Sequence, residues 1–208
     1  SHPPRRRQLD LGRVWCAVCP FMIYGELTQK FVTSRLGAAL RKWPNVPHCY
    51  GWLGLDQRGD WYMRDDQTQA QGSFAQAKGS RLQHDKLIAF IQRNYLADEH
   101  GQWYFQNGPQ RVFVELLAAP FVWRLHDDWS VWSADGQAQH VLHCVVDEEG
   151  RVYLSTHNGL GLVHSQDVGV VADALSANHW EQKKMRASEL ERAYGFVKSP
   201  QLRALGIT

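Results

Sequence analysis

The sequence has few cysteines and no motif that is specific for one kind of catalysis. Only four of its 208 residues are cysteine, which is too few for a disulfide-stabilised secreted scaffold. A serine elbow, a phosphate-binding loop and a glycine-rich dinucleotide fingerprint are all absent from it. We therefore expect a cytoplasmic protein, and the sequence predicts no catalytic residue and no cofactor.

The sequence also lacks a long apolar segment near its start. The apolar run Val14–Ile23 follows an arginine-rich stretch, but it is too short to span a bilayer, and no small-residue cleavage site follows it. We expect no membrane partner. We further expect that Met22 lies near the native start, and that residues 1–21 are a leader that is disordered or foreign to the native protein.

The net positive charge of the chain comes from that leader. The chain has a formal net charge of +2, but the leader holds four arginines against one aspartate, so the rest carries −1. Outside the leader the one tight cationic group is Lys183–Arg186, which we interpret as a solvated surface. Binding to nucleic acid needs a larger cationic cluster, so the sequence predicts no nucleic-acid partner.

Ten histidines and the Cys16-x-x-Cys19 spacing suggest a metal site at first sight. No second cysteine or histidine pair follows at zinc-finger spacing, and alternation along a strand places His140 and His143 on opposite faces. Cys144 shares a face with His140, but no oxyanion element accompanies this pair. The sequence therefore predicts no metal site and no cysteine nucleophile.

One short pattern occurs three times, at Asp56–Tyr62, Asp98–Tyr104 and Asp147–Tyr153. In each copy Asp precedes Gly by three residues and an apolar pair follows. This spacing is typical of a type I turn whose Gly takes the left-handed position of a bulged hairpin. The aspartates are therefore predicted to serve turn geometry, and each copy predicts a hairpin.

Helical periodicity and capping residues predict four helices. The Gln-rich stretch Asp65–Ser80 has few large apolar side chains and is predicted to be a solvated loop. The predicted helices are Leu27–Trp43, Leu82–Tyr95 with His84 and Asp85 in its first turn, a helix capped by Ser165 or Asp167, and a short helix that begins at Ser188 and is stopped by Ser199-Pro200.

Runs rich in β-branched and aromatic residues predict strands throughout the middle of the chain, with Asp135-Gly136 as a further tight turn. The order of elements predicts an α+β fold of mostly antiparallel strands with recurring hairpin units, a few packed helices and no doubly wound sheet. We expect the leader 1–21, a helix–hairpin–helix lobe 22–100, a β-rich lobe 101–175 and a C-terminal helical tail 176–208.

Polar residues near the far ends of the predicted hairpin strands are candidates for a ligand-binding cleft. The segments after the second and third hairpins resemble each other, Phe105–Gly108 and Thr156–Gly159. The alternative is that Asn-Gly serves only as a turn and that the two charged residues of the next strand pair with each other. The candidate residues are Arg64, Asn107, Arg111, Glu115, His157 and Asn158.

Four motifs follow one another between Tyr50 and Leu175. They are Gly59-x-Trp61, Leu87-Ile88-x-Phe90, Asp98-x-x-Gly101-x-Trp103-Tyr104 and a segment from Pro109 through Arg111, Val112, Val114, Glu115, Ala119 and Pro120 to Phe121-Val122. In the order of these motifs the chain distantly resembles the proteobacterial domain-of-unknown-function family twelve eighty-five. The resemblance implies an α+β fold with repeated units and a role in ligand binding or signal transduction. Two features depart from that family: the Gln-rich stretch is longer here, and Gln110 stands where the family usually has an acidic residue.

Our leading hypothesis is a non-enzymatic bacterial protein that binds a small ligand or acts in regulation or signalling. One alternative is a hydrolase-like enzyme with a dispersed Asp/Glu/His/Arg site. Another is an interaction module whose tryptophan-rich face, drawn from nine tryptophans, docks a partner protein or a second copy in a homodimer.

Overall fold

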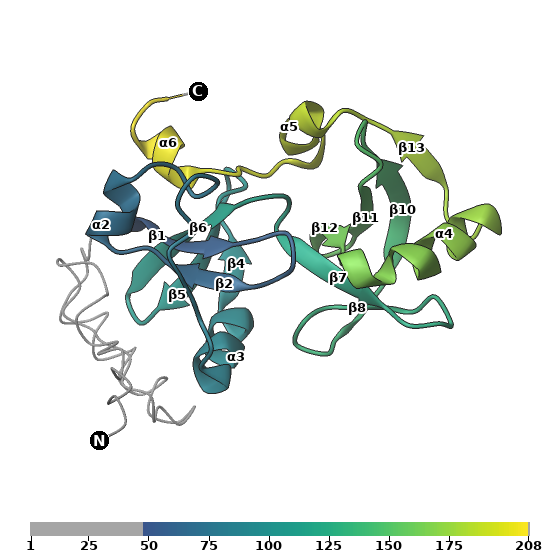
Figure 1. Cartoon of the computed structure of the whole chain (residues 1–208), viewed down its shortest axis with the longest axis horizontal. Coiled ribbons are helices and arrows are strands. Elements are labelled where there is room, and N and C mark those ends of the chain that lie inside the picture. The colour runs from purple at the N-terminus through teal and green to yellow at the C-terminus, as the bar shows by residue number, and fades with distance from the viewer. Residues whose placement is uncertain (1–47, 208) are drawn as a thin grey trace, which may run out of the picture.

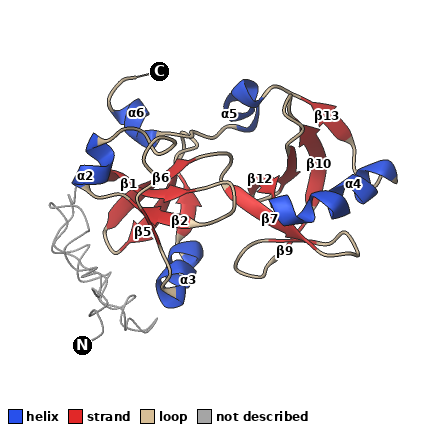
Figure 2. Cartoon of the chain, viewed as in Figure 1, coloured by secondary structure: helices blue, strands red, loops and turns tan. Residues whose placement is uncertain are grey.

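The computed structural model describes residues 48–207, which fold into two β-sheets with short helices around them (Figures 1 and 2). The predicted leader and the predicted helix Leu27–Trp43 lie outside the described residues. No helix within residues 48–207 has both the length and the apolar character needed to cross a membrane.

The first sheet has six strands in the order β3-β2-β1-β6-β5-β4. Two helices, α2 (Asp66–Ala70) and α3 (Asp85–Arg93), connect its strands. The strands are β1 (Cys49–Leu55), β2 (Trp61–Met63), β3 (Ser80–Arg81), β4 (Tyr95–Ala97), β5 (Trp103–Asn107) and β6 (Gln110–Leu116).

The second sheet has seven strands in the order β13-β10-β11-β12-β7-β8-β9. The chain enters this sheet between Leu116 and Phe121. The lobe boundary expected between residues 100 and 101 lies inside the β4–β5 hairpin of the first sheet. The strands are β7 (Phe121–Leu125), β8 (Val131–Trp132), β9 (Ala138–Gln139), β10 (Val141–Val146), β11 (Val152–Thr156), β12 (Gly159–Val163) and β13 (Gln182–Lys184).

Both sheets are mixed, which corrects the expectation of a mostly antiparallel protein in one respect. The α+β class holds, and all three predicted hairpins form, as β1–β2, β4–β5 and β10–β11. However, β1 runs parallel to β6, β7 to β12, and β10 to β13. Each parallel pair is joined by a long connection that itself contains other strands, and local sequence patterns do not encode such pairing.

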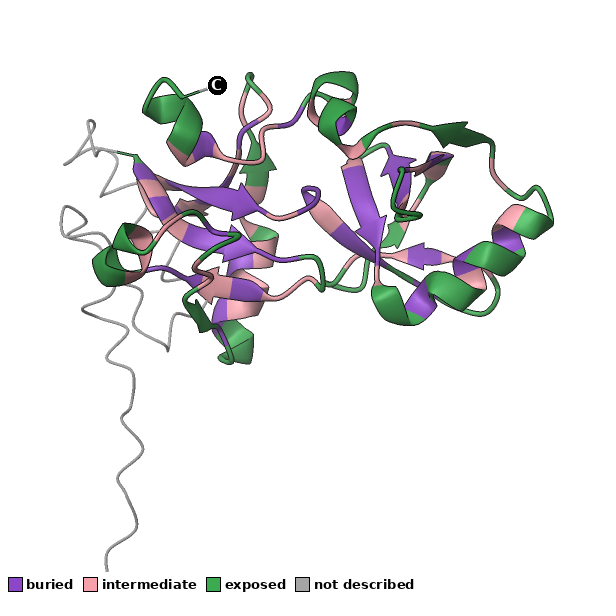
Figure 3. Ribbon diagram, turned by 45° about the horizontal axis from the view of Figure 1, so that its top comes forward, coloured by how far each residue is buried: buried purple, intermediate pink, exposed green. Residues whose placement is uncertain are grey.

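One hydrophobic cluster includes buried residues from both sheets, whose buried strand segments are purple in Figure 3. Leu53 and Phe105 of the first sheet belong to the same buried cluster as Tyr153 and Leu160 of the second. A second cluster lies beneath α4 (Val168–Ser176), where Trp123 is fully buried.

Trp123 fits into this second cluster because the neighbouring strand has a glycine beside it. Its indole Nε1 donates a hydrogen bond to the Leu154 carbonyl oxygen at 3.0 Å. A Cβ atom on Gly161 would lie 2.2 Å from the same indole nitrogen. Gly161 therefore supplies the space that the large ring needs.

The C-terminal segment returns to the first sheet (Figure 1). It contains the 3₁₀ turn η2 (Ala187–Glu189), α5 (Leu190–Tyr194) and α6 (Pro200–Ala204), and the Leu116 amide donates to the Lys198 carbonyl oxygen at 2.8 Å. The predicted role of Ser199-Pro200 was wrong. Ser199 caps the start of α6 and Pro200 occupies its first turn, where a missing N–H costs nothing, while Gly195 in a left-handed conformation ends α5.

The Gln-rich stretch is folded, not a solvated loop. It contains α2, and Phe74 packs over Gly54 with 4% of its surface exposed. The expectation failed because one aromatic anchor and one buried arginine, described below, supply the contacts that the composition appeared to lack.

Candidate functional site

The three repeated aspartates are turn anchors, as their spacing predicts. In each copy one carboxylate oxygen, Oδ1, accepts hydrogen bonds from the backbone N–H groups two and four residues later. All six distances are 2.9 Å. The glycine of each turn has a φ between 77° and 83°, which a residue with a side chain adopts only with strain. These carboxylates are therefore committed to the backbone.

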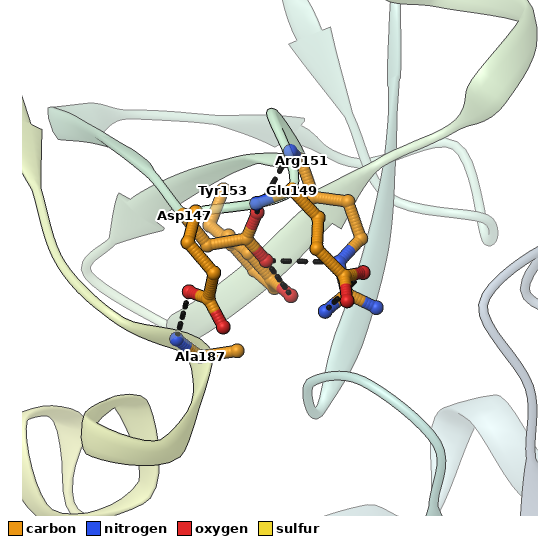
Figure 4. Close-up of polar contacts among 6 residues, drawn as sticks. Asp147, Glu149, Arg151, Tyr153 and Ala187 are labelled. Atoms are coloured by element: carbon orange, nitrogen blue, oxygen red, sulfur yellow. Dashed lines mark hydrogen bonds and ion pairs between the residues drawn. The ribbon is translucent and has the colours of Figure 1, made fainter.

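In two copies the second carboxylate oxygen, Oδ2, accepts a hydrogen bond from a tyrosine hydroxyl six residues later. Asp147 Oδ2 accepts from Tyr153 Oη at 3.3 Å and from Arg151 Nε at 2.8 Å (Figure 4). Tyr62 donates in the same way to Asp56, at 3.2 Å. The Asp–Tyr bond therefore accounts for the tyrosine of the first and third copies, whereas in the second copy Asp98 Oδ2 accepts from the Gln102 side-chain amide at 2.9 Å.

The hydrogen bonds set the charge of this carboxylate. Burial alone would raise the pKa of Asp147, but the bonds from the Arg151 backbone, the Arg151 side chain and the Glu149 backbone outweigh it and lower the pKa. Burial raises the pKa of Tyr153 to about 12, so its hydroxyl remains a donor. Glu148 of the same turn accepts from the Ala187 amide at 2.8 Å, which ties the turn to the C-terminal segment (Figure 4).

Arg64, a predicted site residue, is fully buried and holds the Gln-rich segment in place. Its guanidinium donates to the carbonyl oxygens of Gly51, Gly72 and Ala77 at 2.8–3.0 Å. Burial lowers its pKa, and the charge of Glu115 opposes that shift. With its donors directed at backbone oxygens, Arg64 acts as a structural clamp.

Glu115, the nearby predicted acid, anchors helix α6. Its carboxylate accepts hydrogen bonds from the Ser199 hydroxyl and from the Gln201 amide, the latter at 3.3 Å. Burial raises its pKa, although these bonds and the charge of Arg64 act in the opposite direction. Arg64 and Glu115 thus form one buried polar group between the first sheet and the C-terminal segment.

Asn107 and Arg111 lie at the β5–β6 turn, away from that group. Asn107 is buried and pairs in register with Gln110. The Arg111 guanidinium lies over the Tyr104 ring, 4.5 Å from its centre, an ordinary cation–π arrangement. The structure therefore does not bring these two residues together with Arg64 or Glu115 in a cleft.

His157 and Asn158, the remaining predicted residues, line a cleft. This cavity of about 630 Å³ lies between the α3–β4 region of the first sheet and the β8–β9 hairpin and β11–β12 turn of the second. The volume is within the usual range for small-ligand sites. The lining residues are Phe90, Gln92, Arg93, Asn94, Tyr95, Leu96, Ala97, Trp103, Phe121, Ser133, Asp135, Gln137, Gln139, His157 and Asn158.

Three aromatic rings form one side of the cleft. The Trp103 ring centre lies 4.8 Å from that of Tyr95 and 4.9 Å from that of Phe121, and all three residues are half-buried. The Tyr95 hydroxyl donates to the Pro120 carbonyl oxygen at 2.7 Å, and burial raises its pKa well above the usual value. The rings are therefore held in fixed positions while part of their surface remains accessible.

Amide side chains also line the cleft. The Asn158 Nδ2 group donates to Gln139 Oε1 at 2.8 Å, which joins the β11–β12 turn to β9. The His157 ring stacks on that of His140, with centres 4.9 Å apart. Sequence analysis missed the residues of the β8–β9 hairpin, because Asp135-Gly136 predicts a turn but says nothing of what the turn faces.

The described residues provide little for metal or nucleophilic chemistry. Within residues 48–207 no group of three or more His, Cys, Asp or Glu side chains is placed to hold a metal ion. Burial raises the pKa of the Cys144 thiol to about 11, so it stays protonated and unreactive at neutral pH. Asp135 of the cleft accepts a hydrogen bond from the Ser133 hydroxyl, and no hydrogen bond joins it to His157 within the described part of the chain.

Two solved structures are similar to part of this chain. A DUF1285 family protein from Shewanella baltica OS155 shares 14% identity at a TM-score of 0.41, over 59% of this chain and 91% of its own. A DUF1285 family protein from Silicibacter pomeroyi DSS-3 shares 12% identity at a TM-score of 0.43, over 68% of this chain and 82% of its own. No curated protein gives a significant match.

A family model covers most of the sequence. It is the DUF2944 model, described as "Protein of unknown function (DUF2946)", and it matches residues 34–201. The recognition made from the sequence, an uncharacterised family with a distant resemblance to family twelve eighty-five, is thereby confirmed. The chain belongs to the DUF2944 family of proteins of unknown function.

Proposed function

We propose that this protein is a non-enzymatic binding protein, acting in regulation or signalling, whose ligand occupies the cleft between the two sheets. The observation that carries this proposal is the composition of the cleft: its lining combines three packed aromatic rings with several side-chain amides. Apolar surface with a few polar groups around it is typical of ligand sites.

The arrangement of ionisable groups favours binding over hydrolysis. The cleft includes Arg93, Asp135 and His157, but Asp135 is engaged by Ser133 and His157 stacks on His140. General acid–base catalysis needs a carboxylate or histidine within hydrogen-bond reach of the reacting group, usually oriented by a partner. A carboxylate–histidine pair of this kind is missing among the described residues of the cleft.

The tryptophans also favour a cleft over a flat docking face. Of the tryptophans in residues 48–207, Trp61 and Trp123 are buried and the others are half-buried. An interaction module would present these rings as an exposed patch. We propose a cytoplasmic location, because four cysteines among 208 residues are too few for the disulfide framework of a secreted protein.

A thermal-shift screen with a blocked cleft tests the proposal. The wild-type protein is screened against metabolites, nucleotides, sugars and metal salts. A ligand at one hundred times its Kd adds about 2.7 kcal/mol of stability, which for a chain of this size raises Tm by roughly 5–10 °C. A site in the cleft predicts that Gln139→Trp, which places a large ring among the lining residues, abolishes the shift.

The matched control is Gln182→Trp. Gln182 lies on β13, the opposite edge strand of the same sheet, where it is exposed and outside the cleft. This variant should respond to ligand as the wild type does. A compound that stabilises the wild type and Gln139→Trp equally would contradict the proposal.

A further inference from the structure

Strand β4 leaves one edge open to the cleft. Among residues 48–207 it is the last strand of its sheet and pairs only with β5. The Asn94 carbonyl oxygen accepts from the Gln106 amide and the Asp98 amide donates to the Gln102 carbonyl oxygen, both at 2.9 Å. Alternate residues of an antiparallel strand bond to the same neighbour, so Leu96 also faces β5. The N–H and C=O groups of Tyr95 and Ala97 consequently point the other way.

The cleft follows this open edge. Four consecutive residues, Asn94 to Ala97, line it. Successive side chains of a strand point to opposite faces of the sheet, so a cavity that lay on one face would contact every second residue. That all four residues line it indicates that the cavity reaches the backbone edge, and Trp103 of β5 shows that it also extends over one face of the sheet.

The cleft is also lined by groups of the same chemistry. Gln137, Gln139 and Asn158 contribute primary amides, and each such amide has the donor and acceptor types of a peptide group. Asn158 Nδ2 donates to Gln139 Oε1, and Gln139 Nε2 donates to the Gln137 carbonyl oxygen, which leaves the second N–H of each of these two amides for a ligand. The cleft therefore contains both a strand edge and a group of side-chain amides.

We propose that the cleft binds an extended polypeptide segment of a partner protein, which adds to β4 as a further strand. An extended chain offers N–H and C=O groups at the two-residue spacing at which Tyr95 and Ala97 present theirs. Its other edge meets the amides of Gln137, Gln139 and Asn158. A small planar ligand would leave the strand edge unused. This inference rests on the proposed function, because it identifies the ligand class of the same cleft.

The aromatic side specifies part of the partner segment. Tyr95 and Ala97 pair opposite Phe105 and Trp103, so all four side chains are on one face of the sheet. A residue of the added strand that pairs with Ala97 projects toward the same face, beside Trp103. The cleft has both Arg93 and Asp135, so neither sign of charge dominates. The segment is therefore expected to have an apolar residue flanked by uncharged polar residues.

Replacing Ala97 with proline, with a valine variant as the control, tests this mode of binding. Ala97→Pro removes the outward N–H of β4 but no bond to β5, and proline is tolerated on an edge strand in this orientation. Ala97→Val adds similar bulk and keeps the N–H. The probe is a phage-displayed library of random linear peptides, selected on the wild-type full chain, with affinities of the enriched peptides measured for all three proteins.

The expected result is that enriched peptides share an apolar position, bind Ala97→Val within a fewfold of the wild type and bind Ala97→Pro about tenfold or more weakly, since a lost donor leaves a buried acceptor unpaired. Equal binding to Ala97→Pro, or no enrichment, overturns the strand-addition inference. Circular dichroism of both variants shows whether each is folded. If Ala97→Pro is unfolded, peptide-dependent protection of the Tyr95 and Ala97 amides from hydrogen exchange decides instead, and unchanged exchange overturns the inference.

Failure of this inference and failure of the proposed function give different results. If small molecules raise Tm in the wild type but not in Gln139→Trp, while no peptide is enriched, the cleft is a ligand site for a different class of ligand. The proposed function then stands and strand addition is rejected. If no peptide is enriched, and no small molecule raises the Tm of the wild type more than that of Gln139→Trp, both the proposed function and strand addition are rejected.

Discussion

Replacing Asp147 with alanine should destabilise the protein more than the equivalent change in the second turn. The Asp147 carboxylate accepts from two backbone amides at 2.9 Å, from Arg151 at 2.8 Å and from the Tyr153 hydroxyl at 3.3 Å. Loss of the backbone caps costs about 1–2 kcal/mol by analogy with helix caps. The unpaired buried hydroxyl of Tyr153 adds about 1–3 kcal/mol. Arg151 is largely solvated, so its ion pair adds only a few tenths of a kcal/mol.

The expected total for Asp147→Ala is about 2–5 kcal/mol. Asp98→Ala should cost about 2–3 kcal/mol, because Asp98 has the same backbone bonds, and its other oxygen accepts one partly buried bond from the Gln102 side-chain amide, worth about 1 kcal/mol, in place of the bond from a buried tyrosine hydroxyl. Urea denaturation, fitted with a common slope, measures both values. Tyr153→Phe in the Asp147→Ala background should restore part of the loss, since it removes the unpaired hydroxyl. Equal costs for the two alanine variants, or no effect of Tyr153→Phe in that background, would refute this account of the repeat.

Three further predictions concern the fold. Gly101→Ala should destabilise the protein by about 2–4 kcal/mol, because its Cβ would lie 2.1 Å from a backbone oxygen. Gly150→Ala, whose Cβ would have no atom within 4 Å, should cost only the strain of the left-handed conformation, about 1–2 kcal/mol. Thermal unfolding of the two variants compares these costs. Asp147→Asn should be less stable than the wild type at neutral pH, and this difference in the free energy of unfolding should disappear at acid pH. The folded pKa of Asp147 lies below the unfolded value of about 3.9, so its contribution is present above that pH and disappears as the pH falls through the folded pKa, which urea denaturation at several pH values can follow. Arg64→Met should leave three carbonyl oxygens without their donor and make the segment around α2 the first site of limited proteolysis, while cleavage there at the wild-type rate would contradict the clamp.

The sequence predicted the local turns well because their cause is local. Asp and Gly three residues apart determine a five-residue turn by contacts within that turn, so all three hairpins form where expected. The parallel pairing of β1 with β6 depends on residues about sixty positions apart. No short pattern encodes such a contact, which is why the mixed character of the sheets was not predicted.

The candidate site was predicted only in part for the same reason. His157 and Asn158 were selected as polar residues after a strand, and they do line the cleft. Arg64 and Glu115 were selected by the same argument, but they are buried and satisfied by backbone groups and by the C-terminal segment. Whether a polar residue faces a cleft or the interior depends on which sheet packs beside it, and that is a tertiary property.

The most direct measurement of the central claim is a crystallographic soak of the wild-type protein with a library of small planar and amide-containing fragments. The account predicts that bound fragments gather in the cleft, in contact with Trp103 or Phe121 on one side and with Gln139 or Asn158 on the other, and that the Gln139→Trp crystal shows none there. Fragments that gather at another surface, while the wild-type cleft stays empty in crystals where solvent reaches it freely, would contradict the account.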